Sequence, residues 1–308
     1  MEILTYRDLE SKAEMLPLMD SAFDWAVHPK GFKKMIDSDS RLKNGPVGFC
    51  AVENNLLVAF VGVMDLNTRT LDGGVEHVGG LWGVATLPTH AGKGISMNLM
   101  TRAHQYFREK GYRFSFLCTS RYLVAYAMYR KLGYTDLIDW LGAYKVLEPT
   151  KTGTSPKRRA AGFDFSKLLR IHANCFAGRS GFVLRDRGFL KYEKWSLEIA
   201  DKECIIDGNS YVIFKNTGTK YRGVMIRELV ARDAEATGNL LDLMEARAEG
   251  YVYDKFVIDE TLLNVYKLRG YTIQDRSYKV VMAKPLADDA SSRQTYGPKF
   301  SMTSLDLF

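Results

Sequence analysis

The chain has 308 residues, of which 46% are hydrophobic and 26% are charged, and its formal net charge is +7. This balance is typical of a globular protein and excludes a disordered one, and the length exceeds what one hydrophobic core usually organises, so we expect two domains. Because the start is charged and no apolar run approaches the roughly 20 residues of a membrane span, we expect a cytoplasmic protein without a membrane partner.

Four cysteines are spread along the chain, with no CxxC pair and no histidine at ligand spacing: Cys50, Cys118, Cys175 and Cys204. This pattern predicts buried free thiols rather than a disulfide framework or a metal site. Cys118 would act as a nucleophile only in a reaction through an acyl-enzyme, and no partner base is visible for it.

Aromatic and acidic residues gather near the N-terminus, where Phe23, Asp24, Trp25 and Phe32 lie close together in the sequence. An aromatic wall with a carboxylate would suit a cationic amine, whereas core packing is the commoner use of such residues. Both interpretations stay open from the sequence.

The stretch PTHAGKGISMNLM, residues 88–100, holds two glycines and a lysine between a predicted strand and a predicted helix. An apolar run over 81–87 predicts the strand, and the helix is predicted by apolar residues at helical spacing: Ile95, Leu99, Ala103 and Tyr106. A helix start leaves unpaired N–H groups and the positive end of its dipole exposed. The loop therefore favours an anionic ligand.

Residues 148–161 contain the one dense basic cluster of the chain, KRR at 157–159, in a segment whose composition is that of a linker. No aromatic interleaving or recognised binding motif accompanies it, so we expect a solvated linker and no nucleic-acid partner. A basic protein also suits a polyanionic cofactor.

Two parts of the chain resemble each other. MYRKLGY at 128–134 and VYKLRGY at 265–271 both place a tyrosine in a helix-like run that ends before Gly-Tyr, and upstream of each a strand-like run precedes a helix-like one. The sequence therefore predicts one unit used twice, in residues 1–147 and 162–286, followed by a tail at 287–308.

The two copies differ at the glycine loop. Where the first copy has AGKGIS, the second has ARDAEATG, which places Asp233 and Glu235 at the predicted helix start. Carboxylates there suit helix capping and would repel a phosphate. We therefore expect only the N-terminal copy to bind the anion.

The order of these elements resembles the GNAT N-acetyltransferase superfamily, and VATLPTHAGKGISMNLM is similar to the corresponding segment of the tandem "enhanced intracellular survival" acetyltransferases. The resemblance implies an α/β fold with two tandem GNAT-type domains, each a mixed, mostly antiparallel sheet flanked by helices. It further implies that the first is catalytic and the second degenerate. In that group a sterol-carrier-like domain follows, whereas here 22 residues follow Leu286.

The resemblance also implies acetyl-CoA as cosubstrate, without a metal, held by the loop and by the strand end before it. These residues are Val84, Ala85, Thr86, Ala91, Gly92, Lys93, Gly94, Ile95 and Ser96. The superfamily pattern R/Q-x-x-G-x-G/A puts Ala91 at the Arg/Gln position, so one phosphate contact worth roughly 1.5–3 kcal/mol is missing. Lys93 and the flexibility of Gly92 would partly restore it.

Acetyl transfer by direct amine attack on a thioester needs backbone N–H groups for the oxyanion, an acid for the leaving thiolate and a base for the amine. A strand that splays from its neighbour at 84–86 would supply the N–H groups. Tyr129 matches the superfamily's general acid by its place five residues before Tyr134, and Tyr126 is its rival. For the base, the resemblance implies Glu76, a water, or the terminal carboxylate of Phe308.

The tail reads as polar up to Ser301, as a disordered end would, but Leu305, Leu307 and Phe308 are apolar. We expect Leu305 and Leu307 to anchor the end so that its carboxylate can act as a base. Simple packing or a contact in a homo-oligomer are the alternatives.

The function we predict is acetyl transfer from acetyl-CoA to a primary amine of a small molecule or peptide. The alternative is a non-catalytic acyl-CoA sensor or an interaction protein on the same scaffold.

Overall fold

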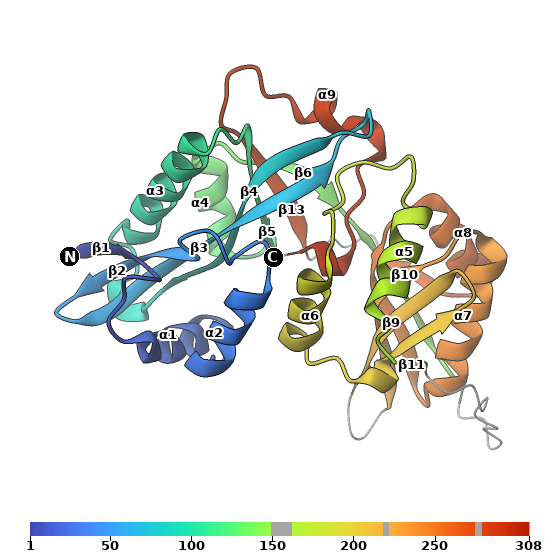
Figure 1. The fold of residues 1–308 in the computed structure, drawn as a ribbon. Helices are drawn as coiled ribbons and strands as arrows, with labels where there is room; N and C mark the ends of the chain where they lie inside the picture. The colour runs from blue at the N-terminus through green and yellow to red at the C-terminus, as the bar shows by residue number, and fades with distance from the viewer. Residues whose placement is uncertain (149–161, 218–221, 275–278, 308) are drawn as a thin grey trace. The chain divides into compact units, whose positions relative to one another are not determined.

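The computed structural model describes residues 1–148, 162–217, 222–274 and 279–307. They form two compact units, one of residues 1–137 and 280–298 and the other of residues 138–279 and 299–307. Each unit contains one sheet with helices (Figure 1). The fold class is confirmed, because both sheets are mixed and mostly antiparallel.

The first unit has a seven-stranded sheet in the order β1-β2-β3-β4-β5-β13-β6, in which β4 and β5 run parallel. Its main elements are β1 (Glu2–Thr5), α1 (Met15–Phe23), α2 (Pro29–Ser38), β2 (Gly48–Glu53), β3 (Leu56–Arg69), β4 (Val75–Thr86), α3 (Ile95–Glu109), β5 (Phe114–Thr119), α4 (Val124–Lys131), β6 (Thr135–Asp139), β13 (Val280–Pro285) and α9 (Ser292–Tyr296).

The second unit has a six-stranded sheet in the order β12-β7-β11-β10-β9-β8, in which β10 and β11 run parallel. Its main elements are β7 (Leu141–Val146), α5 (Phe165–Cys175), α6 (Arg187–Ser196), β8 (Cys204–Asp207), β9 (Ser210–Thr217), β10 (Gly223–Val230), α7 (Ala234–Arg247), β11 (Tyr251–Val257), α8 (Glu260–Leu268) and β12 (Thr272–Gln274).

Two strands lie in the other sheet than the predicted division at 147 and 162 would place them. β13, red in Figure 1, lies between β5 and β6 of the first sheet, and β7 lies between β11 and β12 of the second. The four residues at 280–283 are all buried, as a central strand requires. The compact units are therefore discontinuous in sequence, unlike the contiguous stretches 1–147 and 162–286 that the sequence predicts.

The helix predicted behind the glycine loop is present as α3. Its apolar stripe, which includes Ile95, Leu99, Ala103 and Phe107, is buried in one core cluster with residues of β2, β3, β4 and β5. This packing fixes the N-terminus of α3 beside the end of β4. No helix among the described ranges is long and apolar enough to span a membrane.

The polar tail is folded, so the prediction of a disorder-like stretch up to Ser301 is wrong. Tyr296 in α9 is fully buried, and its hydroxyl lies 2.8 Å from the Thr68 hydroxyl. Leu305 is buried as predicted, whereas Leu307 is only half-buried, and Phe308 lies outside the described residues. The tail folds because its few apolar and acidic side chains find partners far away in the sequence.

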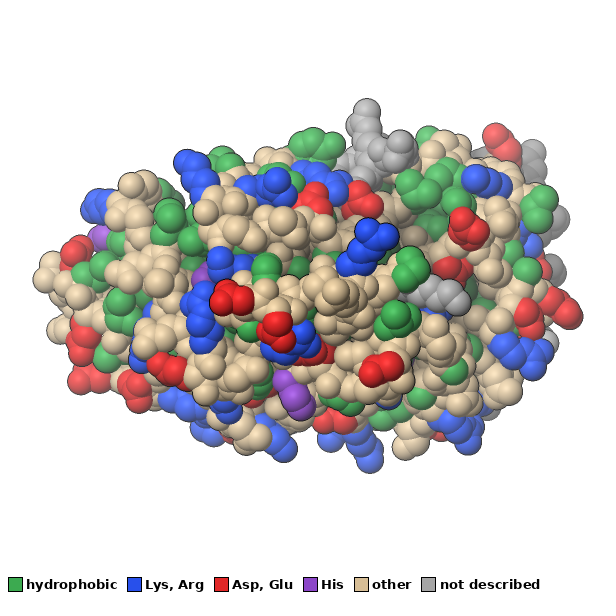
Figure 2. Space-filling model, turned by 90° about the horizontal axis from the view of Figure 1, so that it is seen from above, with side chains coloured by type: hydrophobic (Ala, Val, Ile, Leu, Met, Phe, Trp, Pro, Cys, Tyr) green, Lys and Arg blue, Asp and Glu red, His purple; other side chains and the backbone are tan. Residues whose placement is uncertain are grey.

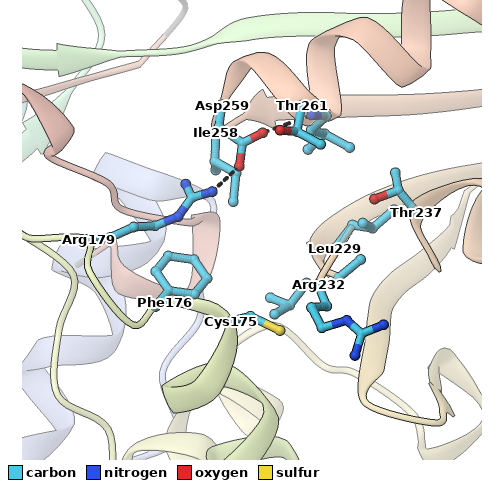
Figure 3. Close-up of a pocket in the computed structure, with 12 residues that line it drawn as sticks. Cys175, Phe176, Arg179, Leu229, Arg232, Thr237, Ile258, Asp259 and Thr261 are labelled. Atoms are coloured by element: carbon cyan, nitrogen blue, oxygen red, sulfur yellow. Dashed lines mark hydrogen bonds and ion pairs between the residues drawn. The ribbon is translucent and has the colours of Figure 1, made fainter. Parts of the chain in front are cut away.

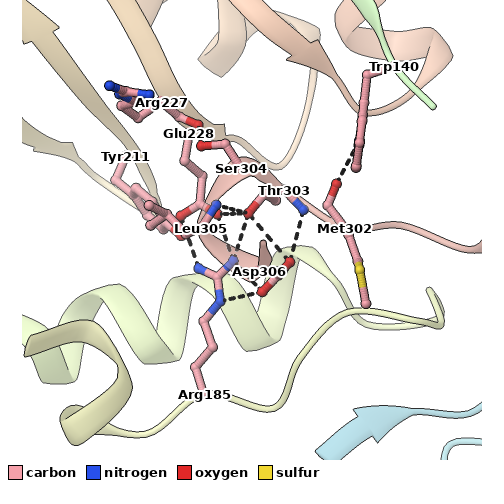
Figure 4. Close-up of polar contacts among 10 residues, drawn as sticks. All are labelled: Trp140, Arg185, Tyr211, Arg227, Glu228, Met302, Thr303, Ser304, Leu305 and Asp306. Carbon is pink, nitrogen blue, oxygen red and sulfur yellow. Dashed lines mark hydrogen bonds and ion pairs between the residues drawn. The ribbon is translucent and has the colours of Figure 1, made fainter. Parts of the chain in front are cut away.

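The last described residues belong to the second unit and are held there by a buried ionic cluster (Figure 4). Arg185 donates to Asp306 Oδ1 at 2.8 Å and to Glu228 Oε1 at 2.8 Å, and all three side chains are 0–1% exposed. Burial opposes ionisation, yet the Arg185 guanidinium lowers the pKa of Glu228 to about 2. The Trp140 indole N–H adds a bond to the Met302 carbonyl at 2.9 Å.

Candidate functional site

The parallel strands β4 and β5 separate before β4 ends. They pair from Val78 opposite Phe114 to Leu81 opposite Leu117, and β4 then continues to Thr86 paired with β3 alone. Gly83 in this segment has a φ of 57°, in the left-handed region that glycine tolerates. The divergence expected at 84–86 is therefore present, and it leaves the β5 side of this segment without a strand ladder.

The glycine loop follows directly and leads into α3. Gly92 and Gly94 have φ values of 75° and 76°, and a Cβ atom added at either would meet no heavy atom within 4 Å. Gly94 is the N-cap residue of α3, and no side chain caps this helix. The first N–H groups of α3 thus face open space, which is the geometry that binds an anion.

Side chains around the loop fix its shape and add charge. The Ser96 hydroxyl lies 2.5 Å from the Thr86 hydroxyl and so ties the first turn of α3 to the end of β4. His90 Nε2 lies 3.0 Å from Glu53 Oε2, and this hydrogen bond lowers the pKa of Glu53. Lys93 is exposed and makes no ion pair with a described residue, so its charge is available to an incoming ligand.

The equivalent helix start in the second unit is closed by the protein itself. The Asp233 carboxylate caps α7 by accepting a hydrogen bond from the Ala236 N–H at 2.9 Å. Glu235 adds a second carboxylate to the first turn. The two starts therefore differ as expected from the sequence, since glycine leaves one open and aspartate occupies the other.

The second unit keeps a small cavity near the ends of its own parallel pair (Figure 3). The cavity measures about 70 Å³ and is lined by the strand end at 229–232, by Thr237 and by the ion pair of Arg179 with Asp259. Such a volume holds a few water molecules. It is far too small for a coenzyme.

Tyr129 occupies α4 beneath the first site. It is 6% exposed, and its ring packs edge-on against that of Tyr134 with centroids 6.2 Å apart. Burial raises the pKa of Tyr129 to about 12, so the phenol keeps its proton at neutral pH. Its hydroxyl makes no hydrogen bond to any residue in the described ranges, which leaves the proton free for a ligand.

Tyr126, the rival of Tyr129, is already engaged. Its hydroxyl donates to Asp136 Oδ1 at 3.0 Å, and the same carboxylate pairs with Arg121 at 2.8 Å. A phenol held by an ion-paired carboxylate is poorly placed to give its proton to a ligand. This geometry favours Tyr129 as the acid.

Glu76 lies away from the loop. It stands seven residues before Gly83, about 23 Å along an extended strand, and it pairs with Arg113 Nη1 at 3.1 Å. The ion pair stabilises the charged carboxylate and occupies it. Both observations favour another group as the base for chemistry at the divergence of β4 and β5.

The three proposed acceptor-side residues are not equivalent. Phe32 is 1% exposed and packs edge-on against Tyr6, Trp25 and Trp82, which favours core packing, the second of the two interpretations, for this residue. Asp24, the left-handed C-cap of α1, is exposed, and Trp25 is half-buried. Only these two remain accessible to a ligand.

Trp82 was not anticipated from the sequence. It is the first residue of β4 beyond the parallel ladder, it is 6% exposed, and its indole N–H has no hydrogen-bond partner. Its ring lies against Phe32 and Phe60. The only signal in the sequence is a tryptophan beside Gly83 in an otherwise aliphatic run.

Charge is distributed evenly on the face drawn in Figure 2, where Lys and Arg side chains alternate with Asp and Glu. Within the described ranges, no three His, Cys, Asp or Glu side chains gather as ligands of a metal ion would.

Comparison with known proteins agrees with this geometry. Residues 6–136 match the family model described as an acetyltransferase (GNAT) domain. No protein with curated annotation matches the sequence.

Solved structures share the fold over nearly the whole chain at low identity. The GCN5-related N-acetyltransferase from Kribbella flavida aligns with a TM-score of 0.64 and 18% identity, over 92% of this chain and 72% of its own. Eis1 from Mycobacterium abscessus aligns with a TM-score of 0.63 and 17% identity, over 92% of this chain and 73% of its own. A putative acetyltransferase from Pyrococcus horikoshii aligns with a TM-score of 0.58 and 13% identity, over 100% of this chain and 95% of its own.

Proposed function

We propose a function from the premise that residues 6–136 of this chain form a GNAT acetyltransferase domain. The first unit binds acetyl-CoA and transfers its acetyl group to a primary amine by direct attack. The observation that carries this proposal is the contrast between the two helix starts, where Gly94 leaves α3 open and Asp233 caps α7.

The coenzyme's pyrophosphate fits the open start of α3, where the N–H groups and Lys93 provide positive charge. The pantetheine arm and the thioester then lie along Val84–Thr86, where β4 has left β5. Ala91 offers no side-chain donor, so this loop binds phosphate through its backbone and Lys93.

The reaction uses few groups of the protein. The neutral amine attacks the thioester carbonyl, and free N–H groups of the β4 end stabilise the oxyanion. As the tetrahedral intermediate collapses, the C–S bond breaks and Tyr129 protonates the departing thiolate. A phenol with a pKa near 12 keeps this proton at neutral pH and is in its protonated form when the C–S bond breaks.

The base in this proposal is the terminal carboxylate of Phe308. Support comes from the residues just before it, because Leu305 is buried and the buried Asp306 is paired with Arg185. Appending a few glycines after Phe308 should cut turnover and leave acetyl-CoA affinity nearly intact. Full activity in the extended protein would transfer the role to water.

On the acceptor side we propose Asp24 and Trp25, which are accessible and combine a carboxylate with an aromatic ring. This pair suits a cationic amine on a small molecule or a peptide. Asp24→Asn should raise the KM for the amine and leave that for acetyl-CoA unchanged.

The test of the whole proposal has two stages. Acetyl-CoA at a hundredfold over its Kd should stabilise the protein by about 2.7 kcal/mol, seen as a thermal shift. Thiol release is then followed with polyamines, aminoglycosides and lysine peptides as acceptors. A thermal shift without turnover on any amine would identify the chain as an acyl-CoA sensor instead.

A further inference from the structure

Arg227 occupies an irregular position in the second sheet. The parallel ladder of β10 and β11 ends at Ile226 opposite Asp254, and the register of β10 with β9 shifts between Ile226 and Glu228. Arg227 is therefore a bulge residue at the point where the strand pair separates. Bulges re-aim side chains and occur next to functional sites more often than elsewhere.

The Arg227 guanidinium has no partner. Its Nε is shielded from solvent and makes no hydrogen bond, and its side chain forms no ion pair with any residue in the described ranges. Its backbone carbonyl accepts a hydrogen bond from the Ser304 hydroxyl. In Figure 4 the guanidinium points away from the cluster around Arg185. A half-buried cation without a partner costs stability.

A second cation stands beside it. Lys255 and Arg227 are each the first residue beyond the last pair of the parallel ladder, Asp254 opposite Ile226, and the charge of Arg227 acts on Lys255. Lys255 is exposed and makes no ion pair with a described residue. Burial and the charge of Arg227 both lower the pKa of Lys255. Like charges on adjacent strands destabilise a sheet.

The one carboxylate that acts on Arg227 is committed elsewhere. Glu203 raises the pKa of Arg227, whereas burial lowers it more. The Glu203 carboxylate already accepts hydrogen bonds from the N–H groups of Ala200 and Asn216 and lies 3.7 Å from Lys215. The positive charge of Arg227 and Lys255 is therefore not neutralised by the protein.

We propose that Arg227 and Lys255 form a second anion site, which binds a phosphate or carboxylate group of a small ligand independently of the acetyl-CoA loop. A guanidinium provides a planar fork of donors and an ammonium provides a point charge, and both suit an oxyanion. The bulge places the Arg227 side chain at the point where β10 and β11 separate. Binding of the anion supplies the missing partner and removes the repulsion between the two cations.

The experiment uses the full chain without acetyl-CoA and titrates inorganic phosphate at constant ionic strength, with heat of binding as the readout. A parallel titration with acetate distinguishes phosphate from carboxylate as the preferred group. Arg227→Met should weaken phosphate binding by about tenfold to a hundredfold, as expected for a lost charge-assisted hydrogen bond. Lys255→Met should weaken it less.

Arg222→Met is the matched control, because Arg222 lies directly before β10 but is exposed and paired with Glu249 at 2.8 Å. It should bind phosphate as the wild type does. Without phosphate, Arg227→Met should melt no lower than the wild type, since it removes a repulsion. Phosphate should then raise the melting temperature of the wild type and of Arg222→Met more than that of Arg227→Met.

Three results would overturn the proposal. The first is the absence of saturable phosphate or acetate binding in the wild type. The second is unchanged phosphate affinity in a variant that lacks both cations. The third is a loss of acetyl-CoA affinity in Arg227→Met as large as the loss for phosphate, which would assign both cations to the coenzyme. Failure of acetyl-CoA to bind at all would leave this proposal unaffected.

Discussion

At the scale of one residue, the role proposed for Tyr129 concerns proton transfer and not the binding of the coenzyme. Its hydroxyl is unbonded and keeps its proton, while its ring packs in the core. Tyr129→Phe keeps the ring, so it should lower kcat by about a hundredfold and change the KM for acetyl-CoA little. Steady-state thiol release measures both. Tyr126→Phe is the control and should retain activity; an unaffected Tyr129→Phe enzyme would reduce this residue to packing.

The proton of Tyr129 also sets an expectation for the pH profile. A phenol with a pKa of about 12 stays protonated across the working range, so the acid cannot limit the rate below about pH 11. Turnover should rise with pH as the base and the amine lose protons, and level off without an alkaline fall below pH 10. A decline between pH 8 and 9 that Tyr129→Phe removes would contradict this assignment.

Gly94 and Gly111 allow a matched test of the loop. Both have a φ of 76° and open space at the Cβ position, and they lie at opposite ends of α3. Gly94→Glu and Gly111→Glu therefore impose the same backbone strain and the same charge. Only Gly94→Glu should abolish acetyl-CoA binding in a thermal-shift titration. Equal affinity in both variants would remove the loop from the site.

At the scale of elements, the two helix starts predict the stoichiometry of binding. Asp233 and Glu235 put negative charge at the first turn of α7, where α3 has Gly94 and Lys93. Calorimetry should give one acetyl-CoA per chain, and Gly94→Glu should leave no residual binding. A second mole of coenzyme, or binding that survives Gly94→Glu, would show that the second unit is not degenerate.

The tail is the element whose stability depends most on buried charge. Arg185→Met would leave Glu228 and Asp306 without a counter-charge in a fully buried place, which costs about 3–5 kcal/mol. Urea unfolding should show this loss, and Arg222→Met should change stability by less than about 1 kcal/mol because its ion pair is exposed. If both variants unfolded alike, the cluster would not hold the tail.

At the scale of the whole molecule, the first sheet is not complete without a strand from the far end of the sequence, β13. Residues 1–147 expressed alone would lack β13 and leave β5 and β6 as open edges. We expect that fragment to aggregate, as size-exclusion chromatography would show. The same fragment with residues 280–298 fused through a linker should recover solubility. A soluble, folded 1–147 fragment would show that the first unit does not need β13 to fold.

Much of this architecture is predictable from the sequence, because local patterns determine it. The glycine loop and α3 follow from the glycines and the apolar spacing, whereas the divergence at 84–86 is expected only from the resemblance to the superfamily. The sheets that β7 and β13 join are not predictable in this way. Each of the two strands comes after a similar helix, a Gly-Tyr pair and a short strand, so the local pattern does not say which sheet each one joins. The sequence does not single out Trp82, and it leaves Phe32 open between core packing and an acceptor pocket. The reason is that an aromatic residue carries no sign of whether it packs in the core or faces a ligand. Asp306 folds the tail through Arg185, which lies 121 residues away in sequence.

The place of β13 between β5 and β6 also has a consequence for biosynthesis. A chain that leaves the ribosome in order has made β5 and β6 long before residues 280–285, which must enter between them. The first sheet therefore waits, partly assembled, while all strands of the second sheet are translated. Such long-range pairing slows folding and exposes strand edges to other chains in the meantime. Once β13 is in place, the first unit holds a strand whose neighbours in sequence on both sides, up to residue 279 and from residue 299, belong to the second unit.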